Sequence, residues 1–134
     1  MKPLTQAEAR LYSPLALAFL GDSVYEVMAR EYLLRKANQP AAKLHEQKVQ
    51  LVCAPFQAAA AERLLPHLTE EETGVYKRGR NANNTVPRHT AAKDYHKATG
   101  LESLFGYLYL MGAQERLEEL FQIAINAEEM SAEK

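Results

Sequence analysis

Hydrophobic residues recur along this chain at intervals of three and four positions, the spacing that gathers side chains on one face of an α-helix. Runs of β-branched residues, which would indicate strands, are few. We therefore predict an all-α fold of about seven helices. Proline, glycine and capping residues set the expected ranges: a short helix after residue 5, helices over about 14–36, 38–52 and 55–65, a fifth starting at 69, and two more over about 90–111 and 114–127.

A few local signals define these boundaries. Thr5 and Thr69 each precede a glutamate by three residues, the spacing of a capping box, and Ser13 stands before a proline, which is a helix start. The segment 79–87, GRNANNTVP, interrupts the helical pattern and is predicted to be a loop. Gly100 falls inside the sixth expected helix, where we expect a kink.

Length and composition are those of one domain. At 134 residues and 47% hydrophobic, the chain can bury a single core and has no room for a second. No apolar run reaches the ~18 residues of a membrane span, and the N-terminus lacks the apolar centre of a secretion signal. The only cysteine, Cys53, lies in an apolar run without a disulfide partner. We therefore expect one domain over 1–134, in the cytoplasm and without a membrane partner.

Charge is distributed unevenly although the net charge is only −1. Residues 77–97 carry six basic side chains and one acid, whereas residues 115–134 carry six acids and two bases. A charge run alone is more often a solvated helix face than a binding site. Arginine and asparagine together, however, suit the oxygens of a polyanion. The candidate binding residues are Lys77, Arg78, Arg80, Asn81, Asn83, Asn84, Arg88, His89, Lys93 and Lys97.

Asp22 interrupts the apolar helical run LALAFLGDSVYE at residues 15–26. A carboxylate on the apolar side of a helix costs several kcal/mol unless a cation, a hydrogen bond or a proton compensates for it. Glu26 shares the face of Asp22 one turn later, but pairing with Arg30 is a more common fate for such a residue than binding a metal.

Glu102 lies in a similar setting, within the apolar stripe of ATGLESLFGYLYLMG at residues 98–112. One carboxylate from each of two packed helices is enough to hold Mg²⁺, which keeps several waters. A water bound to the metal could then act as a nucleophile. Taken alone, two such acids are a weak signal, because many helices carry an acid at the edge of the core.

The two acidic segments together resemble the ribonuclease III family. AFLGDSVYE is similar to the signature of that family, a glutamate followed by FLGDS, and ESLFGYLYL is similar to its second acidic motif, EALIGAIYLD. The similarity spans about residues 14–111. The longer run RGRNANNTVPRHTAAKDYHKATGLESLFGYLYL resembles the Mini-ribonuclease III branch, which lacks a double-stranded-RNA-binding module.

This resemblance implies an all-helical homodimer that hydrolyses double-stranded RNA with Mg²⁺ and leaves 5′-phosphate ends. Asp22 and Glu102 then match the catalytic, metal-binding acids, and Phe19 matches the aromatic residue at the dimer interface. The basic and asparagine residues of 77–97 would hold the RNA. The branch matures 23S ribosomal RNA precursors, which makes a large-subunit ribosomal protein a further candidate partner.

The chain departs from the family pattern at two positions. Ala18 replaces the glutamate four residues before Asp22, and Thr99 replaces the aspartate three residues before Glu102. We therefore expect a sparser metal shell with more waters, with Glu26 and Asp94 as possible accessory acids. The alternatives are a catalytically inert module that binds RNA or assists ribosome assembly, and a nucleotide pyrophosphohydrolase, which usually needs more clustered acids.

Overall fold

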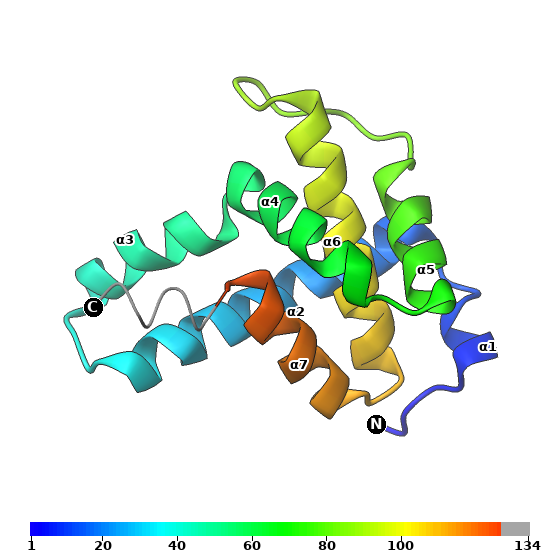
Figure 1. Cartoon of the computed structure of the whole chain (residues 1–134), viewed down its shortest axis with the longest axis horizontal. Coiled ribbons are helices and arrows are strands. Elements are labelled where there is room, and N and C mark those ends of the chain that lie inside the picture. Colours follow the sequence, from blue (N-terminus) through cyan, green and yellow to red (C-terminus); the bar gives the residue numbers. More distant parts are fainter. Residues whose placement is uncertain (127–134) are drawn as a thin grey trace.

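The computed structural model of the chain, described here for residues 1–126, contains seven α-helices, one 3₁₀ turn and no strand within that range (Figure 1). The predicted all-α fold is therefore confirmed. In chain order the elements are α1 (Gln6–Ala9), α2 (Pro14–Lys36), α3 (Ala41–Val52), α4 (Ala54–Leu64), the 3₁₀ turn η1 (Leu65–His67), α5 (Glu70–Arg80), α6 (Ala92–Leu110) and α7 (Gln114–Ala124).

The local signals mark most helix starts correctly. Both capping boxes form, with the Thr5 hydroxyl accepting from the Glu8 amide and the Thr69 hydroxyl accepting from the Glu72 amide. The side chain of Ser13 caps α2 in the same way. The range predicted for α2, 14–36, matches the observed helix.

The predicted ends of α5 and α7 need correction. Helix α5 continues through Arg80, so the loop begins at Asn81 and not at residue 79. Helix α7 ends at Ala124, and Ile125 and Asn126 form a turn, whereas residues 127–134 lie outside the described residues. Helix α6 runs without interruption through Gly100, and the kink expected there stays a prediction.

Helix α6 forms the centre of the fold. It packs against α2, α4 and α5, and α7 completes the enclosure (Figure 1). Between residues 98 and 108 every side chain of α6 is buried except that of Glu102, which is only partly buried. An acid is thus carried on the most enclosed helix of the molecule, at the one position of that stretch that reaches solvent.

Aromatic side chains fill the core between α2, α6 and α7. The ring of Tyr25 lies 5.6 Å from that of Phe105 and 5.6 Å from that of Phe121, in tilted and edge-on geometries. The Tyr25 hydroxyl donates a 2.7 Å hydrogen bond to the carbonyl of Leu51, which ties α3 to this core. Among residues 1–126, no helix combines the length and apolar character needed to cross a membrane.

Candidate active site

Helices α2 and α6 cross with their backbones in contact. A β-carbon added at Gly21 would lie 1.6 Å from the carbonyl oxygen of Glu102, and one added at Gly106 would lie 2.0 Å from the carbonyl oxygen of Leu17. Only glycine permits so close an approach. The crossing point is thus fixed at Gly21 and Gly106, and the residue after Gly21 is Asp22.

This crossing brings the carboxylates of Asp22 and Glu102 together. Burial, and then the negative charge of Asp22, raise the pKa of Glu102 to about 8. The two acids nominated from the sequence therefore share one site, although they stand far apart along the chain. The expected burial of Asp22 is wrong, because its side chain is exposed. Of the two acids, only Glu102 is partly buried.

Gln57 on α4 lies beside Glu102 and was not identified from the sequence. The side chain of Gln57 is 3% exposed, and its amide opposes the rise in the pKa of Glu102. A buried amide within the apolar helix APFQAAAAERL was the available signal. A polar group in the immediate surroundings of the acids is therefore not among the residues predicted from the sequence.

The two substituted positions of the family motif offer no replacement ligands. Ala18 and Thr99 are 7% and 4% exposed, respectively. The hydroxyl of Thr99 donates a 3.0 Å hydrogen bond to the carbonyl of Tyr95 within its own helix. Residues 1–126 contain no cluster of three or more histidine, cysteine or acidic side chains placed to hold a metal.

The candidate accessory acids have different surroundings. Glu26 lies 3.1 Å from Arg30 and 3.3 Å from the largely buried ammonium of Lys48. The pairing with Arg30 is the outcome that the sequence favoured. Asp94 lies in the first turn of α6, two turns before Glu102, and is partly buried.

The basic segment, residues 77–97, spans the end of α5, the loop and the start of α6 (Figure 1). The guanidinium of Arg80 stacks 5.7 Å from the ring centre of Tyr76, and Lys97 forms a 2.6 Å ion pair with Glu62. Arg88 and His89 lie exposed in the loop. The segment presents its positive charge at the end of the same helix that carries Glu102.

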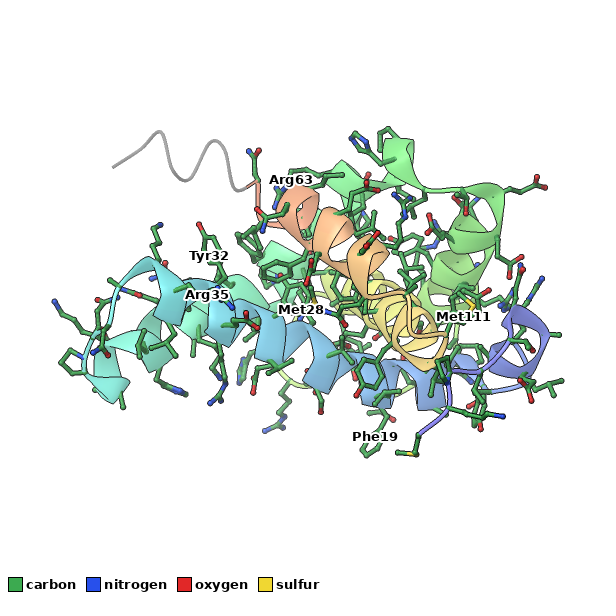
Figure 2. All side chains as sticks on the ribbon, turned by 90° about the horizontal axis from the view of Figure 1, so that it is seen from below. Phe19, Met28, Tyr32, Arg35, Arg63 and Met111 are labelled. Atoms are coloured by element: carbon green, nitrogen blue, oxygen red, sulfur yellow. The ribbon has the colours of Figure 1, made fainter. Side chains whose placement is uncertain are left out.

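Phe19 points away from the helical body (Figure 2) and is 84% exposed. It precedes Asp22 by three residues, so it stands about one turn from the acid on α2. Leu15, Tyr12 and Leu11 are also exposed near the start of this helix. An apolar surface thus borders the acidic site.

The donor set at this site fits Mg²⁺. Two carboxylate oxygens from different helices are hard ligands, and Mg²⁺ commonly binds through one or two carboxylates while keeping several waters. Burial and the negative charge of Asp22 raise the pKa of Glu102, and a cation held by these two residues would offset both effects. The buried amide of Gln57 is a further polar group beside the two acids.

Comparison with known proteins agrees with this geometry. The ribonuclease III domain family matches residues 15–113, which include both acids and the whole basic segment. The chain belongs to the ribonuclease III family. Ribonuclease III membership makes it an endoribonuclease.

Relatives place the chain within one branch of the ribonuclease III family. A Mini-ribonuclease 3 from Clostridium tetani is 40% identical over 96% of this chain and 87% of its own length. A Mini-ribonuclease 3 from a Synechococcus strain is 46% identical over 89% of this chain and 85% of its own. A crystal structure of a Fusobacterium nucleatum protein superposes with a TM-score of 0.79 at 32% identity, covering 87% of this chain and 94% of that one. The resemblance noted in the sequence is confirmed.

Proposed function

We propose that this endoribonuclease cleaves double-stranded RNA with Mg²⁺ held between Asp22 and Glu102. The observation that carries the proposal is the pairing of these two carboxylates at the crossing of α2 and α6. Ribonuclease III membership supports a double-stranded RNA substrate. The two acids are the proposed catalytic residues and metal ligands.

The two carboxylates have distinct tasks in this proposal. When bound, Mg²⁺ supplies charge stabilisation at the phosphorus and lowers the pKa of a bound water. Asp22 is exposed and would face the incoming RNA, whereas Glu102 is partly buried and is carried by the central helix α6. With a pKa of about 8, Glu102 carries a proton near neutral pH, and that proton must leave when the metal binds.

The basic segment is the proposed RNA-binding surface. Its lysine and arginine side chains would contact phosphates, and its asparagines would contact phosphates or 2′-hydroxyls across the wide minor groove of A-form RNA. Such contacts read shape and charge more than sequence. The residues concerned are Lys77, Arg78, Arg80, Asn81, Asn83, Asn84, Arg88, His89, Lys93 and Lys97.

A homodimer would provide one acidic site for each strand of the duplex. The exposed Phe19, beside Asp22, supports a two-fold interface on this face of α2. Glu26 and Asp94 are proposed accessory acids, with Asp94 inside the basic segment and Glu26 paired with Arg30 and Lys48. Two sites on opposite strands would leave 5′-phosphate ends with short 3′ overhangs.

The proposed natural substrate is a precursor of 23S ribosomal RNA, as the resemblance of the sequence to the Mini-ribonuclease III branch implies. A large-subunit ribosomal protein that presents the RNA is the matching partner. Cleavage of a duplex made from the paired ends of the 23S precursor should be faster than cleavage of an unrelated duplex of equal length. Equal rates with and without the ribosomal protein would remove that partner from the proposal.

The direct test uses the purified protein and a long RNA duplex. Cleavage should require Mg²⁺ and stop with EDTA, and Asp22→Asn or Glu102→Gln should each lower kcat by at least about 100-fold. Glu118→Gln, an exposed acid on α7, is the matched control and should cleave at the wild-type rate. RNA binding should persist in both site variants.

Two outcomes would contradict the proposal. Wild-type cleavage by Asp22→Asn would place the metal elsewhere. Duplex binding without cleavage, by the wild-type protein as well as the variants, would instead favour an inert RNA-binding module.

A further inference from the structure

Gln57 has an unsatisfied buried oxygen beside the active site. Its amide nitrogen donates a 2.9 Å hydrogen bond to the carbonyl of Val52, which fixes the orientation of the amide. The side-chain oxygen Oε1 is buried and has no hydrogen-bond partner within residues 1–126. An unsatisfied buried oxygen costs about 1–3 kcal/mol, so such atoms usually have an unseen partner.

The carboxylate of Glu102 lies beside this amide. The Gln57 side chain is within hydrogen-bonding reach of this carboxylate and is 3% exposed, so its amide meets the acid inside the protein. Helices α4 and α6 pack directly together, so the amide and the acid face each other across this contact. Gln57 therefore stands between the acid and the α3–α4 connection.

The hydrogen bond to Val52 does not explain the choice of glutamine by itself. It satisfies one carbonyl near the end of α3, a task that uses a single N–H group. The second N–H and the oxygen of the Gln57 amide take no part in this bond. An apolar residue of the same size would avoid the cost of burying that oxygen.

The two departures from the family motif give a reason for a buried polar side chain at position 57. With Ala18 and Thr99 in place of two acids, more of the coordination shell of the metal must be water. Each of those waters has two hydrogens that need acceptors, and partners of this kind orient the ligands of a metal. The Oε1 atom of Gln57 is a buried acceptor without a donor in the described part of the chain, and its side chain lies next to one of the two acids.

We infer that Gln57 is a positioning residue of the metal site, whose amide N–H orients the carboxylate of Glu102 and whose Oε1 accepts a hydrogen bond from a water bound to the cation. This inference rests on the proposed function, since it assumes a cation between Asp22 and Glu102. Gln57 does not touch the metal itself. Its effect on cleavage passes through Glu102 and the bound water.

The test measures metal binding without RNA, by titrating the protein with Mn²⁺ and following free Mn²⁺ by electron paramagnetic resonance. Gln57→Met keeps the size of the side chain and removes both polar groups, and should weaken Mn²⁺ binding about tenfold. Gln57→Glu keeps an acceptor oxygen and should bind Mn²⁺ at least as tightly as the wild type. Gln47→Met on α3, which breaks an amide pair with Gln39, is the matched control and should bind normally.

Kinetics give a second readout. At limiting Mg²⁺, Gln57→Met should lower kcat about tenfold without changing KM for the duplex, and excess Mg²⁺ should restore the rate. If Gln57 had a purely structural role, Gln57→Glu would lose more activity than Gln57→Met. The reason is that Gln57→Glu would place a carboxylate against the Val52 carbonyl. In the wild-type protein, the Gln57 side-chain amide resonances should shift on Mg²⁺ addition while those of Gln47 do not, a measurement that needs no variant.

The outcomes separate the inference from the proposed function. Wild-type Mn²⁺ affinity in folded Gln57→Met, equal weakening in Gln57→Glu, or amide resonances of Gln57 that ignore Mg²⁺ would overturn the inference alone. If the wild-type protein binds Mn²⁺ no better than Asp22→Asn does, both the inference and the proposed function are overturned.

Discussion

Gly21 and the backbone of Glu102 are in direct contact. A β-carbon at Gly21 would lie 1.6 Å from the Glu102 carbonyl oxygen, far inside any allowed separation. Because Asp22 follows Gly21 along the same helix, one contact sets both the packing of α2 on α6 and the spacing of the two carboxylates. Fold and site are therefore coupled at this glycine.

Gly21→Ala should push the two helices apart. The clash involves backbone on both sides, so we expect a loss of at least about 3 kcal/mol in the free energy of unfolding, with loss of cleavage. Gly74→Ala on α5 is the matched control, since its β-carbon would meet only the end of the Arg78 side chain, at 3.8 Å. That control should be stabilised by about 0.5–1 kcal/mol. Denaturant titrations of both variants would show the difference, and a fully active, stable Gly21→Ala would disprove the coupling.

The sequence predicts the helices well because their signals are local. Capping threonines, Ser13 before a proline, and helical spacing depend on neighbours within one or two turns. The role of Gly100 in packing is not local, and no pattern in its own helix reveals it. In the fold, a β-carbon at Gly100 would lie 2.7 Å from the ring of Tyr76, so the glycine makes room for α5 within a continuous helix.

The site could be predicted only in part, because some of its features also depend on contacts between distant segments. The motifs identify Asp22 and Glu102 but do not show how deeply each side chain is buried. In the structure Asp22 is exposed. The exposure follows from its place on the rim of the α2–α6 crossing, which no pattern within α2 reveals. Gln57 was not predicted as a site residue. Its position beside Glu102 depends on the packing of α4 against α6, two segments that lie far apart in the sequence.

The raised pKa of Glu102 predicts a pH-dependent stability. The folded protein holds this proton up to about pH 8, whereas the unfolded chain releases it near the ordinary value of 4.5. The stabilising contribution is therefore complete below pH 4.5 and is lost as the pH rises to about 8. In EDTA, wild-type stability should fall relative to that of Glu102→Gln between pH 5 and pH 8.5, by on the order of a few kcal/mol at most. Parallel curves in denaturant titrations would contradict this shift.

The ion pair of Arg116 with buried Glu72 predicts a large local contribution to stability. The guanidinium donates at 2.8 and 2.7 Å to the two carboxylate oxygens, and at 2.8 Å to the carbonyl of His67. Burial raises the pKa of Glu72, but the bonds from Arg116 and Thr69 outweigh it and leave the pKa below its usual value. Arg116→Ala would strand this carboxylate and should cost about 3–5 kcal/mol.

Arg35→Ala provides the comparison for this pair. Arg35 contacts Glu31 at 2.7 Å, but both side chains are largely exposed, so its loss should cost under about 0.5 kcal/mol. Equal losses of unfolding free energy in the two variants would mean that burial of Glu72 does not matter.

The basic segment predicts a graded response to salt. Arg88 is exposed and forms no ion pair within residues 1–126, whereas Lys97 is paired with Glu62 at 2.6 Å. Arg88→Gln should therefore lower the log–log slope of RNA affinity against salt by about one, and Lys97→Gln should lower it by less. Filter-binding titrations of a duplex across several salt concentrations would measure both slopes. An unchanged slope for Arg88→Gln would remove this residue from the RNA-binding surface.

Phe19 predicts the oligomeric state. Its side chain is 84% exposed beside the exposed Leu15, and an exposed apolar surface of this kind is typical of a protein–protein interface. Phe19→Ala should weaken self-association, which analytical ultracentrifugation would detect as a shift toward monomer at micromolar concentration. Val49→Ala, an exposed residue on α3, should leave the association unchanged. Because Asp22 lies one turn from Phe19, dissociation should also change the product pattern, from short duplexes cut on both strands toward singly nicked RNA. A wild-type protein that stays monomeric yet cuts both strands together would rule out this interface.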